Sequence, residues 1–263
     1  MTELFVIKIG GNIIDDEAKL TSCLKSFAAI EADKILVHGG GKIATRIGDK
    51  LGIESKYADG RRITDAETID LVTMVYGGLV NKKIVARLQA LGCNAIGLTG
   101  ADGNLIPAKK RQVKDIDFGF VGDIDSENLL SMYWDELLQL GFTPVVAPLT
   151  HDGNGQILNT NADTIAQELA KVLSELYDVS LIYSFEKSGV LLDVNDELSV
   201  INNLDNRYYT ELKAGGKIFA GMLPKLDNAF AALNSGVKKV IIGNAGKLDK
   251  LIAGEAGTTI IND

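Results

Sequence analysis

The sequence predicts an α/β protein, a three-layer α/β/α sandwich with a mainly parallel central sheet. Short apolar runs typical of buried strands alternate along the chain with longer segments whose apolar residues recur at helical spacing. Repeated strand-then-helix order gives parallel strands covered by helices on both faces. The chain has 263 residues, 46% of them hydrophobic, which is enough for one large domain or two closely joined lobes.

The strands are predicted from apolar runs that end at turn residues. They fall at residues 4–9, 34–38, 93–98, 143–149, 179–185, 238–243 and 258–262. Residues 105–124 contain the alternating stretch "DFGFVGDI" and are expected to form a hairpin.

The helices are predicted from apolar spacing and from the residues that end them. They fall at about residues 17–30, 42–51, 64–91, 129–140, 161–177 and 223–235. Thr64 with Glu67 resembles a capping box, Asn161 is a candidate cap, and Gly77-Gly78 could break the third helix. The stretch "YADGRRITDAE" is expected to be a polar loop.

Composition excludes several classes of function. The net charge of −8 argues against nonspecific binding to nucleic acid or to anionic membranes. The two cysteines, Cys23 and Cys93, are isolated, which indicates no disulfide framework, no metal-ligand spacing and a reducing compartment. The beginning "MTELFVIKIGG" lacks a basic region and no apolar run is long enough to span a membrane, so a cytoplasmic protein is expected.

Two glycine clusters follow the first two predicted strands, Gly10-Gly11 and Gly39-Gly40-Gly41. Parallel sheets bind ligands at the carboxyl ends of their strands, where backbone N–H groups and a helix N-terminus favour an anion. A glycine needed only for a tight turn is the simpler explanation of either cluster alone. Two clusters at one edge of one sheet favour an anion site.

Two other nucleotide motifs fit less well. The residues "GGGKIA" match a dinucleotide fingerprint, with Asp59 at the expected distance, but Asp59 lies in a polar stretch and the glycines follow the second strand. No GxxxxGK[ST] sequence occurs, so a P-loop is absent.

Several charged and polar residues near these turns are candidates for a site. Lys8 lies in an apolar run one residue before a glycine turn, where it is a phosphate ligand or a cation extending from a strand end. Lys225 lies near a helix start, where a cation opposes the helix dipole. Arg62 could be a solvated loop arginine, and Asn159 and Asp163 could be turn residues. His38 is expected to be a packed histidine at a strand end.

The motifs "VIKIGGN", "VHGGG", "DGRRIT", "LNTNAD" and "AGMLPK" occur in an order that resembles the amino acid kinase family. Their spacing is most similar to that of the members that phosphorylate N-acylated glutamate. The resemblance runs from Leu4 to near the C-terminus and implies transfer of phosphate from ATP to the γ-carboxylate, the second step of arginine biosynthesis.

The resemblance also assigns roles. Lys8 and Lys225 match lysines that stabilise the transferring phosphoryl group, and Asp163 matches the acid that orients them. The remaining matches are Gly10 and Gly11 at the ATP phosphates, Gly40 and Gly41 at the substrate, Arg62 at its α-carboxylate and Asn159 at its acylated backbone. No general base is expected, because a carboxylate with a pKa of about 4.3 is already ionised at neutral pH.

The nucleotide is expected to bind residues from two later segments, Glu186, Ser188, Gly189, Lys217, Ile218 and Phe219. The sequence departs from the family here, since "SFEKSGVLL" has Glu186 where relatives have an aspartate. The adenine pocket is therefore less well defined by the resemblance than the phosphate site.

The resemblance completes the expectations for the whole chain. Residues 1–263 would be one domain, with an acyl-amino-acid lobe at about 1–170 and a nucleotide lobe at about 171–263. ATP would be the co-substrate, Mg²⁺ would be held mainly by phosphates and water without a named protein ligand, and the chain would form a homodimer. Because the first strand begins by about Leu4, the extra N-terminal helix of arginine-inhibited relatives is not expected, and neither is inhibition by arginine.

Three points stay open. The acyl group could be acetyl or succinyl. The acceptor could instead be another carboxylate, such as N-acylaminoadipate, or a carbamate or phosphate. A regulator that binds a nucleotide without catalysis is the alternative from a different class, although Lys8, Asp163 and Lys225 are all present.

Overall fold

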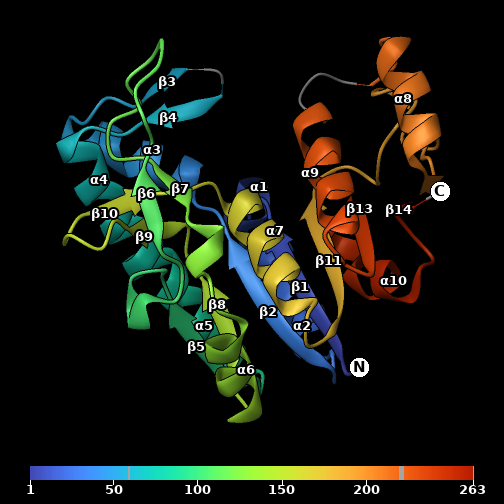
Figure 1. Cartoon of the computed structure of the whole chain (residues 1–263), viewed down its shortest axis with the longest axis horizontal. Helices are drawn as coiled ribbons and strands as arrows, with labels where there is room; N and C mark the ends of the chain where they lie inside the picture. The colour runs from blue at the N-terminus through green and yellow to red at the C-terminus, as the bar shows by residue number, and fades with distance from the viewer. Residues whose placement is uncertain (59, 219–221, 263) are drawn as a thin grey trace. The chain divides into compact units, whose positions relative to one another are not determined.

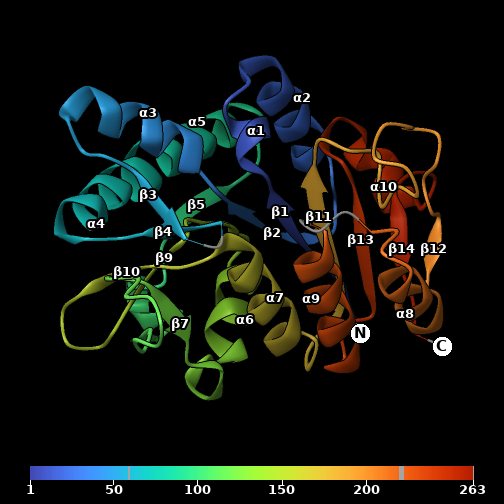
Figure 2. The same ribbon diagram turned by 90° about the horizontal axis from the view of Figure 1, so that it is seen from above.

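The computed structural model describes residues 1–58, 60–218 and 222–262. The chain forms two compact units, one of Met1–Ile35 with Ala166–Asp263 and the other of Leu36–Ile165. The predicted class is confirmed, because the sheet strands are mainly parallel and helices flank them in a three-layer α/β/α arrangement (Figures 1 and 2). No helix within the described residues is both long and apolar enough to span a membrane.

The first unit is built on parallel strands with one antiparallel neighbour. The strands lie in the order β12 (Asn203–Leu204), β14 (Thr258–Ile260), β13 (Lys239–Asn244), β11 (Asp178–Phe185) and β1 (Glu3–Ile9). β1 is parallel to β11 and β11 to β13, whereas β14 runs antiparallel to β13. The buried runs of β1 and β11 show that both faces of this part of the sheet are covered.

Helices cover both faces of the first unit. Figure 2 shows α2 (Glu17–Ala28) and α10 (Leu248–Ala253) on one side of the strands, and α8 (Asn206–Ala214) and α9 (Leu223–Asn234) on the other. The short α1 (Gly11–Ile14) directly follows β1, and the 3-10 turn Ala245–Lys247 follows β13. The helices α1, α8 and α10 were not predicted, because they are short or carry few apolar residues.

The second unit holds the parallel strands β8 (Thr143–Val146) and β5 (Ala95–Leu98) next to β2 (Asp33–His38), where the chain enters the unit. Its helices are α3 (Gly41–Leu51), α4 (Ala66–Val72), the π-helical Thr73–Val80, α5 (Asn81–Ala90) and α6 (Ser131–Gln139). Two 3-10 turns lie at Asp102–Asn104 and Ser126–Asn128, and α7 (Ala162–Leu173) begins where this unit ends.

Three two-stranded hairpins complete the second unit. They are β3 (Lys56–Ala58) with β4 (Arg61–Ile63), β6 (Ala108–Lys110) with β7 (Gly122–Ile124), and β9 (Leu149–His151) with β10 (Ile157–Asn159). The hairpin predicted within residues 105–124 is confirmed. The polar loop predicted for "YADGRRITDAE" is wrong, since five of its eleven residues lie in β3 and β4 and its last two begin α4.

Two predictions about helix signals in this unit are also wrong. The cap of α4 is Asp65, whose carboxylate accepts from the Thr68 N–H at 2.9 Å, and not Thr64. The Thr64 oxygen instead accepts from the Asn159 amide, and its hydrogen is donated to the Arg62 carbonyl. The helix also does not break at Gly77-Gly78 but continues as the π-helical Thr73–Val80.

His38 ends β2 as a packed histidine, as predicted. It is fully buried, and its Nδ1 donates to the Gly39 carbonyl at 2.7 Å. Its Nε2 accepts from the Asn81 amide at 3.1 Å, and the same amide donates to the Val145 carbonyl. Both ring nitrogens are therefore used by the neutral ring. Burial lowers the pKa of His38 to about 4, although the bond to Gly39 opposes this.

This depressed pKa predicts a loss of stability in mild acid. The unfolded chain binds a proton at His38 near its ordinary pKa of 6.5, whereas the folded chain does so only near 4. Stability contributed by the neutral histidine is therefore lost as the pH falls through this window. Between pH 7 and pH 5 the free energy of unfolding should fall by about 2 kcal/mol from this group, measured by urea denaturation.

The control uses the chain's other histidine. His38→Gln should flatten the pH dependence between pH 7 and pH 5, although the variant is less stable at both. His151→Gln should keep most of it, because His151 is partly exposed. A His38→Gln protein with the wild-type pH dependence would contradict this assignment.

Candidate functional site

In the first unit, Lys8 and Lys225 both lie next to Tyr183. Lys8 on β1 is in register with Tyr183 on β11, so their side chains share one face of the parallel pair. The Lys225 ammonium, from α9, lies 5.9 Å from the centre of the Tyr183 ring. Tyr183 is almost completely buried, whereas both lysines are partly exposed. The structure thus gathers two cations, far apart in sequence, around one aromatic ring that sequence reasoning missed.

The glycine turn after β1 is tied to the end of β11. The Gly10 N–H donates to the Ser184 carbonyl at 3.0 Å, so this N–H closes the strand pair. Gly11 begins α1, and a Cβ placed there would meet no atom within 4 Å. Of the two glycines, Gly11 is therefore the one that leaves open space beside the backbone.

In the second unit, Arg62 on β4 is buried and held by several partners. Its guanidinium donates to the Gly41 carbonyl and to the Thr45 hydroxyl, both at 2.9 Å, and to the Ser55 hydroxyl. It also lies 4.9 Å from the centre of the Tyr57 ring. The solvated-arginine interpretation of Arg62 is thus wrong, whereas the neighbouring Arg61 is exposed.

Thr64 connects Arg62 to Asn159. The Thr64 hydroxyl donates to the Arg62 carbonyl at 3.2 Å and accepts from the Asn159 amide at 3.1 Å. Thr64 is fully buried, so these bonds are protected from water. The structure therefore brings together two predicted substrate residues that lie on separate hairpins.

Gly40 and Gly41 serve different purposes at the start of α3. A Cβ on Gly40 would lie 2.9 Å from the Tyr76 ring, and Gly40 has a φ of +157°. A Cβ on Gly41 would meet no atom within 4 Å. Gly40 is therefore required by internal packing, and Gly41 is the position where a ligand could reach the backbone.

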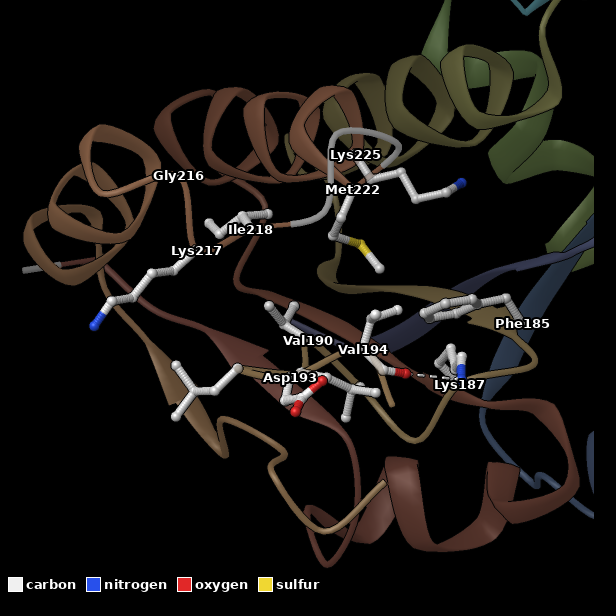
Figure 3. A pocket seen from close by; sticks show the side chains of 13 residues that line it. Phe185, Lys187, Val190, Asp193, Val194, Gly216, Lys217, Ile218, Met222 and Lys225 are labelled. Carbon is white, nitrogen blue, oxygen red and sulfur yellow. Dashed lines mark hydrogen bonds between the residues drawn. The ribbon is translucent and has the colours of Figure 1, made fainter. Parts of the chain in front are cut away.

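A cavity of about 640 Å³ opens in the first unit next to Lys225. Figure 3 shows Ile218 and Met222 on one side of it, facing Val190 and Val194 on the other, with Phe185 at one end. An apolar cleft with a few cations at its rim suits a flat heterocycle attached to an anionic group. The sequence predicted Lys217, Ile218 and Gly189 here, and the structure places all three in the lining.

Not every residue that was predicted for this cavity lines it. Glu186 and Ser188 do not line it, whereas the unpredicted run "VLLDV" at residues 190–194 does. The close packing around residue 189 requires a glycine, because a Cβ on Gly189 would lie 2.7 Å from the Thr258 hydroxyl. Phe219 and Asp59 lie outside the described residues. The apolar run itself was the signal that could have identified the missed lining.

Ser188 contributes to the loop and not to the lining. Its hydroxyl and its backbone N–H both donate to Glu197, at 2.8 and 3.1 Å, and the Lys187 ammonium donates to the same carboxylate at 2.8 Å. The Lys187 ammonium, followed by the Ser188 donors, lowers the pKa of Glu197 to about 2. Figure 3 shows that the Lys187 ammonium also donates to the Val194 carbonyl. Lys187 is thus bonded to both Val194 and Glu197 across the loop that carries the cavity's apolar residues.

Asp163 lies in the first turn of α7, and its backbone N–H donates to the Asn161 side chain at 2.7 Å. Asn161 also accepts from the Thr164 N–H, so the predicted cap is confirmed. Within the described part of the chain, no group of three or more His, Cys, Asp or Glu residues could hold a metal ion.

Comparison with known proteins identifies the pattern. The model of the amino acid kinase family matches residues 3–244. A Cytophaga hutchinsonii protein named acetylglutamate kinase is 57% identical, over 96% of this chain and 95% of that one. A Bacteroides fragilis protein of the same name is 58% identical over 91% of each chain. The structure of Giardia carbamate kinase has a TM-score of 0.72, covers 100% of this chain and 99% of its own, and at 13% identity shows the fold alone.

The two glycines of α3 provide a matched pair of variants. Gly40→Ala should destabilise the protein by about 1–3 kcal/mol, because the methyl group overlaps the buried Tyr76 ring. Gly41→Ala should leave the free energy of unfolding within about 0.5 kcal/mol of the wild type, since its methyl group enters open space. Urea denaturation measures both, and equal stability of the two variants would contradict the distinction.

Proposed function

Because the chain belongs to the amino acid kinase family, we propose that it transfers the γ-phosphoryl group of ATP to the γ-carboxylate of N-acetyl-L-glutamate, the second step of arginine biosynthesis. The observation that carries the proposal is identity of 57% and 58%, over more than nine tenths of both chains, to relatives named acetylglutamate kinase. The cations and glycines of both units and the cavity of the first unit support the same reaction.

Lys8 and Lys225 stabilise the transferring phosphoryl group in this proposal. The reaction brings an anionic acceptor to an anionic donor, so positioning and neutralisation of charge are its main requirements. The two lysines suit this role, because the Tyr183 ring limits where the Lys225 ammonium can lie and Lys8 extends from the strand next to the same tyrosine. Asp163 is the acid that orients the lysines.

Arg62 and Asn159 bind the parts of the substrate that do not react. A guanidinium binds a carboxylate through two parallel hydrogen bonds, and Arg62 is already fixed by Gly41 and Thr45. The Thr64 hydroxyl holds the Asn159 amide in position next to the same strand. We assign the α-carboxylate to Arg62, the acylated nitrogen and its neighbours to Asn159, and the approach to the backbone to Gly41, with Gly40 supporting the turn.

ATP binds in the cavity of the first unit, with Gly10 and Gly11 at its phosphates. Ile218, Met222 and Val190 supply the apolar walls for the base, and Lys217 supplies a cation at the rim. Glu186 and Ser188 act through the loop they belong to. Mg²⁺ is held mainly by phosphate oxygens and water in this proposal.

The setting of the enzyme is part of the proposal. We infer a homodimer that works in the cytoplasm, on the resemblance of the chain to its family. Sedimentation of the purified chain tests the assembly.

A screen of acceptors tests the reaction. ATP consumption is measured with N-acetylglutamate, N-succinylglutamate, N-acetylaminoadipate, free glutamate, aspartate and carbamate, and hydroxylamine traps any acyl phosphate. We expect N-acylglutamates to be phosphorylated far faster than free glutamate, and the ratio of acetyl to succinyl defines the acyl preference. Activity on another acceptor alone would overturn the proposal, and no activity on any acceptor would favour a noncatalytic nucleotide-binding regulator.

Lys225→Met should lower kcat about a hundredfold while changing either KM much less. The lysine is proposed to contact the phosphoryl group chiefly as charge develops, and removal of one such donor typically costs about 3 kcal/mol. Lys213→Met is a matched control, because the Lys213 ammonium also lies over a tyrosine ring, Tyr209, but does not line the cavity. Steady-state kinetics with near-normal kcat in Lys225→Met would return this lysine to a surface role.

Arg62→Lys should raise the KM for the acylated glutamate strongly, leave the KM for ATP nearly unchanged and lower kcat only modestly. The α-carboxylate does not react, so its interaction with Arg62 contributes similarly to the ground state and the transition state. Arg61→Lys is the matched control and should change little, since Arg61 is exposed. Equal behaviour of the two variants, or weaker ATP binding by Arg62→Lys, would show that the assignment of β4 to the amino-acid site is wrong.

A further inference from the structure

A second hollow lies in the second unit, and the proposed reaction does not use it. It has a volume of about 630 Å³ and is formed by β6, the segment after it and Arg61 of β4. In Figure 1 the segment between β6 and β7 runs beside the β3–β4 hairpin. Five cations line the hollow: Arg61, Lys109, Lys110, Arg111 and Lys114.

The charge of this hollow is opposite to that of the chain. Its lining contains five cations but only two acids, Asp115 and Asp123, whereas the whole chain has a net charge of −8. Arg111 pairs with Asp123 at 2.5 Å, and Lys109 pairs with Asp125, outside the lining, at 2.9 Å. The local excess of positive charge therefore belongs to this surface and does not follow from the composition.

Three of the cations remain available to a ligand. Among the described residues Arg61 and Lys114 have no ion-pair partner, and the Lys110 ammonium lies over the Phe120 ring at 4.9 Å. Arg111 lies over the Phe118 ring at 5.6 Å, so an aromatic ring lies next to both Lys110 and Arg111. Cations concentrated in one concave surface, without matching acids, suit a multiply charged anion.

The hollow is separate from the Arg62 site. Successive side chains of a strand point to opposite faces, so Arg61 faces away from the direction that Arg62 takes. Arg62 is buried against α3, whereas Arg61 is exposed and lines the hollow. A ligand in the hollow is therefore not the acylated glutamate bound by Arg62.

A short backbone segment nevertheless connects the two places. Thr64 exchanges backbone hydrogen bonds with both Phe118 and Phe120, at 2.9 and 2.7 Å. The Asn159 N–H donates to the Phe120 carbonyl at 2.9 Å. Between these contacts, a Cβ on Gly119 would lie 2.1 Å from the Thr64 carbonyl oxygen, so the two strands approach as closely as glycine allows. The wall of the hollow that contains Phe118 is thus bonded to the residues that hold Arg62 and Asn159.

We propose that this hollow binds a free small anion with several phosphate or carboxylate groups, and that binding changes the affinity of the Arg62–Asn159 site through residues 118–121. Arg61 and Lys114 contact the anion directly, with Lys110 between them. An anion that draws Arg61 and the Lys110–Lys114 segment together orders the backbone on which Thr64 and Asn159 depend. The coupling is reciprocal, so the amino-acid substrate also changes the affinity for the anion.

Calorimetric titration of the full chain tests binding. Pyrophosphate and citrate are the probes, used without metal ions. We expect a site whose affinity is weakened about tenfold by Arg61→Glu and by Lys114→Glu, since each removes a charged contact and adds a repulsion. Lys50→Glu, an exposed lysine on α3, makes the same change in net charge and should alter binding less than about twofold.

The pattern across probes and variants decides the outcome. Binding of pyrophosphate alone assigns a phosphate ligand, and binding of citrate alone assigns a carboxylate ligand. No binding of either probe at millimolar concentration overturns the proposal. Equal weakening by Lys50→Glu also overturns it, because the effect would then come from net charge.

A second measurement tests the coupling without relying on the proposed reaction. Amide hydrogen exchange at Thr64, Phe120 and Asn159 should slow several-fold when the bound probe is present, and Lys114→Glu should abolish the change. If the enzyme phosphorylates N-acetylglutamate, its KM for that substrate should change about fivefold in the same way. Binding without altered exchange would refute the coupling. Absence of kinase activity would overturn the proposed function, and hydrogen exchange alone would then decide whether the hollow is coupled to the Arg62–Asn159 site.

Discussion

The parallel pairing of β1 with β11 is the constraint on which the chemistry of the first unit depends. It places Lys8 in register with Tyr183 and ends where the Gly10 N–H donates to the Ser184 carbonyl. The turn after β1 and the loop after β11 therefore begin at the same level of the sheet. A shift of one residue would turn Lys8 to the opposite face, away from Tyr183 and Lys225.

In the second unit the comparable constraint is the hydroxyl of Thr64. It is buried between the Arg62 carbonyl and the Asn159 amide, and its backbone is bonded to Phe118 and Phe120. The backbone at Arg62 and the side chain of Asn159, on different hairpins, are thus fixed before any ligand arrives. Because less side-chain entropy is then lost on binding, more of the interaction energy is available for affinity.

Much of this could be predicted from the sequence, because the strands of a covered parallel sheet are apolar runs and their glycine turns are easy to recognise. The buried run of β1 and the cap at Asn161 are examples. The β3–β4 hairpin could not be predicted, because its residues are polar and Thr64, the residue after β4, is bonded to the distant Phe118. Such contacts between distant segments leave no local pattern.

The candidate site residues divide in the same way, into those with a local sequence pattern and those without one. Lys8 and Arg62 were found from their motifs, but the ring of Tyr183 was not, since a tyrosine within an apolar strand has the pattern of an ordinary core residue. The cavity wall at residues 190–194 was missed for a similar reason, because an apolar run is equally typical of a packed core. In both cases the role is given by what lies opposite in the fold, and not by the residue itself.

The chemistry of the acceptor explains why no residue of the proposed site is assigned as a general base. A carboxylate is ionised at neutral pH, so its attack on a phosphoryl group needs no base. His38 is the histidine next to the glycines, and it is neutral, buried and bonded through both ring nitrogens, which makes it a structural residue. What the reaction requires is local positive charge in a chain with a net charge of −8, and that charge must be held in place. The Tyr183 ring does this for Lys225, and the Gly41 carbonyl and the Thr45 hydroxyl do it for Arg62.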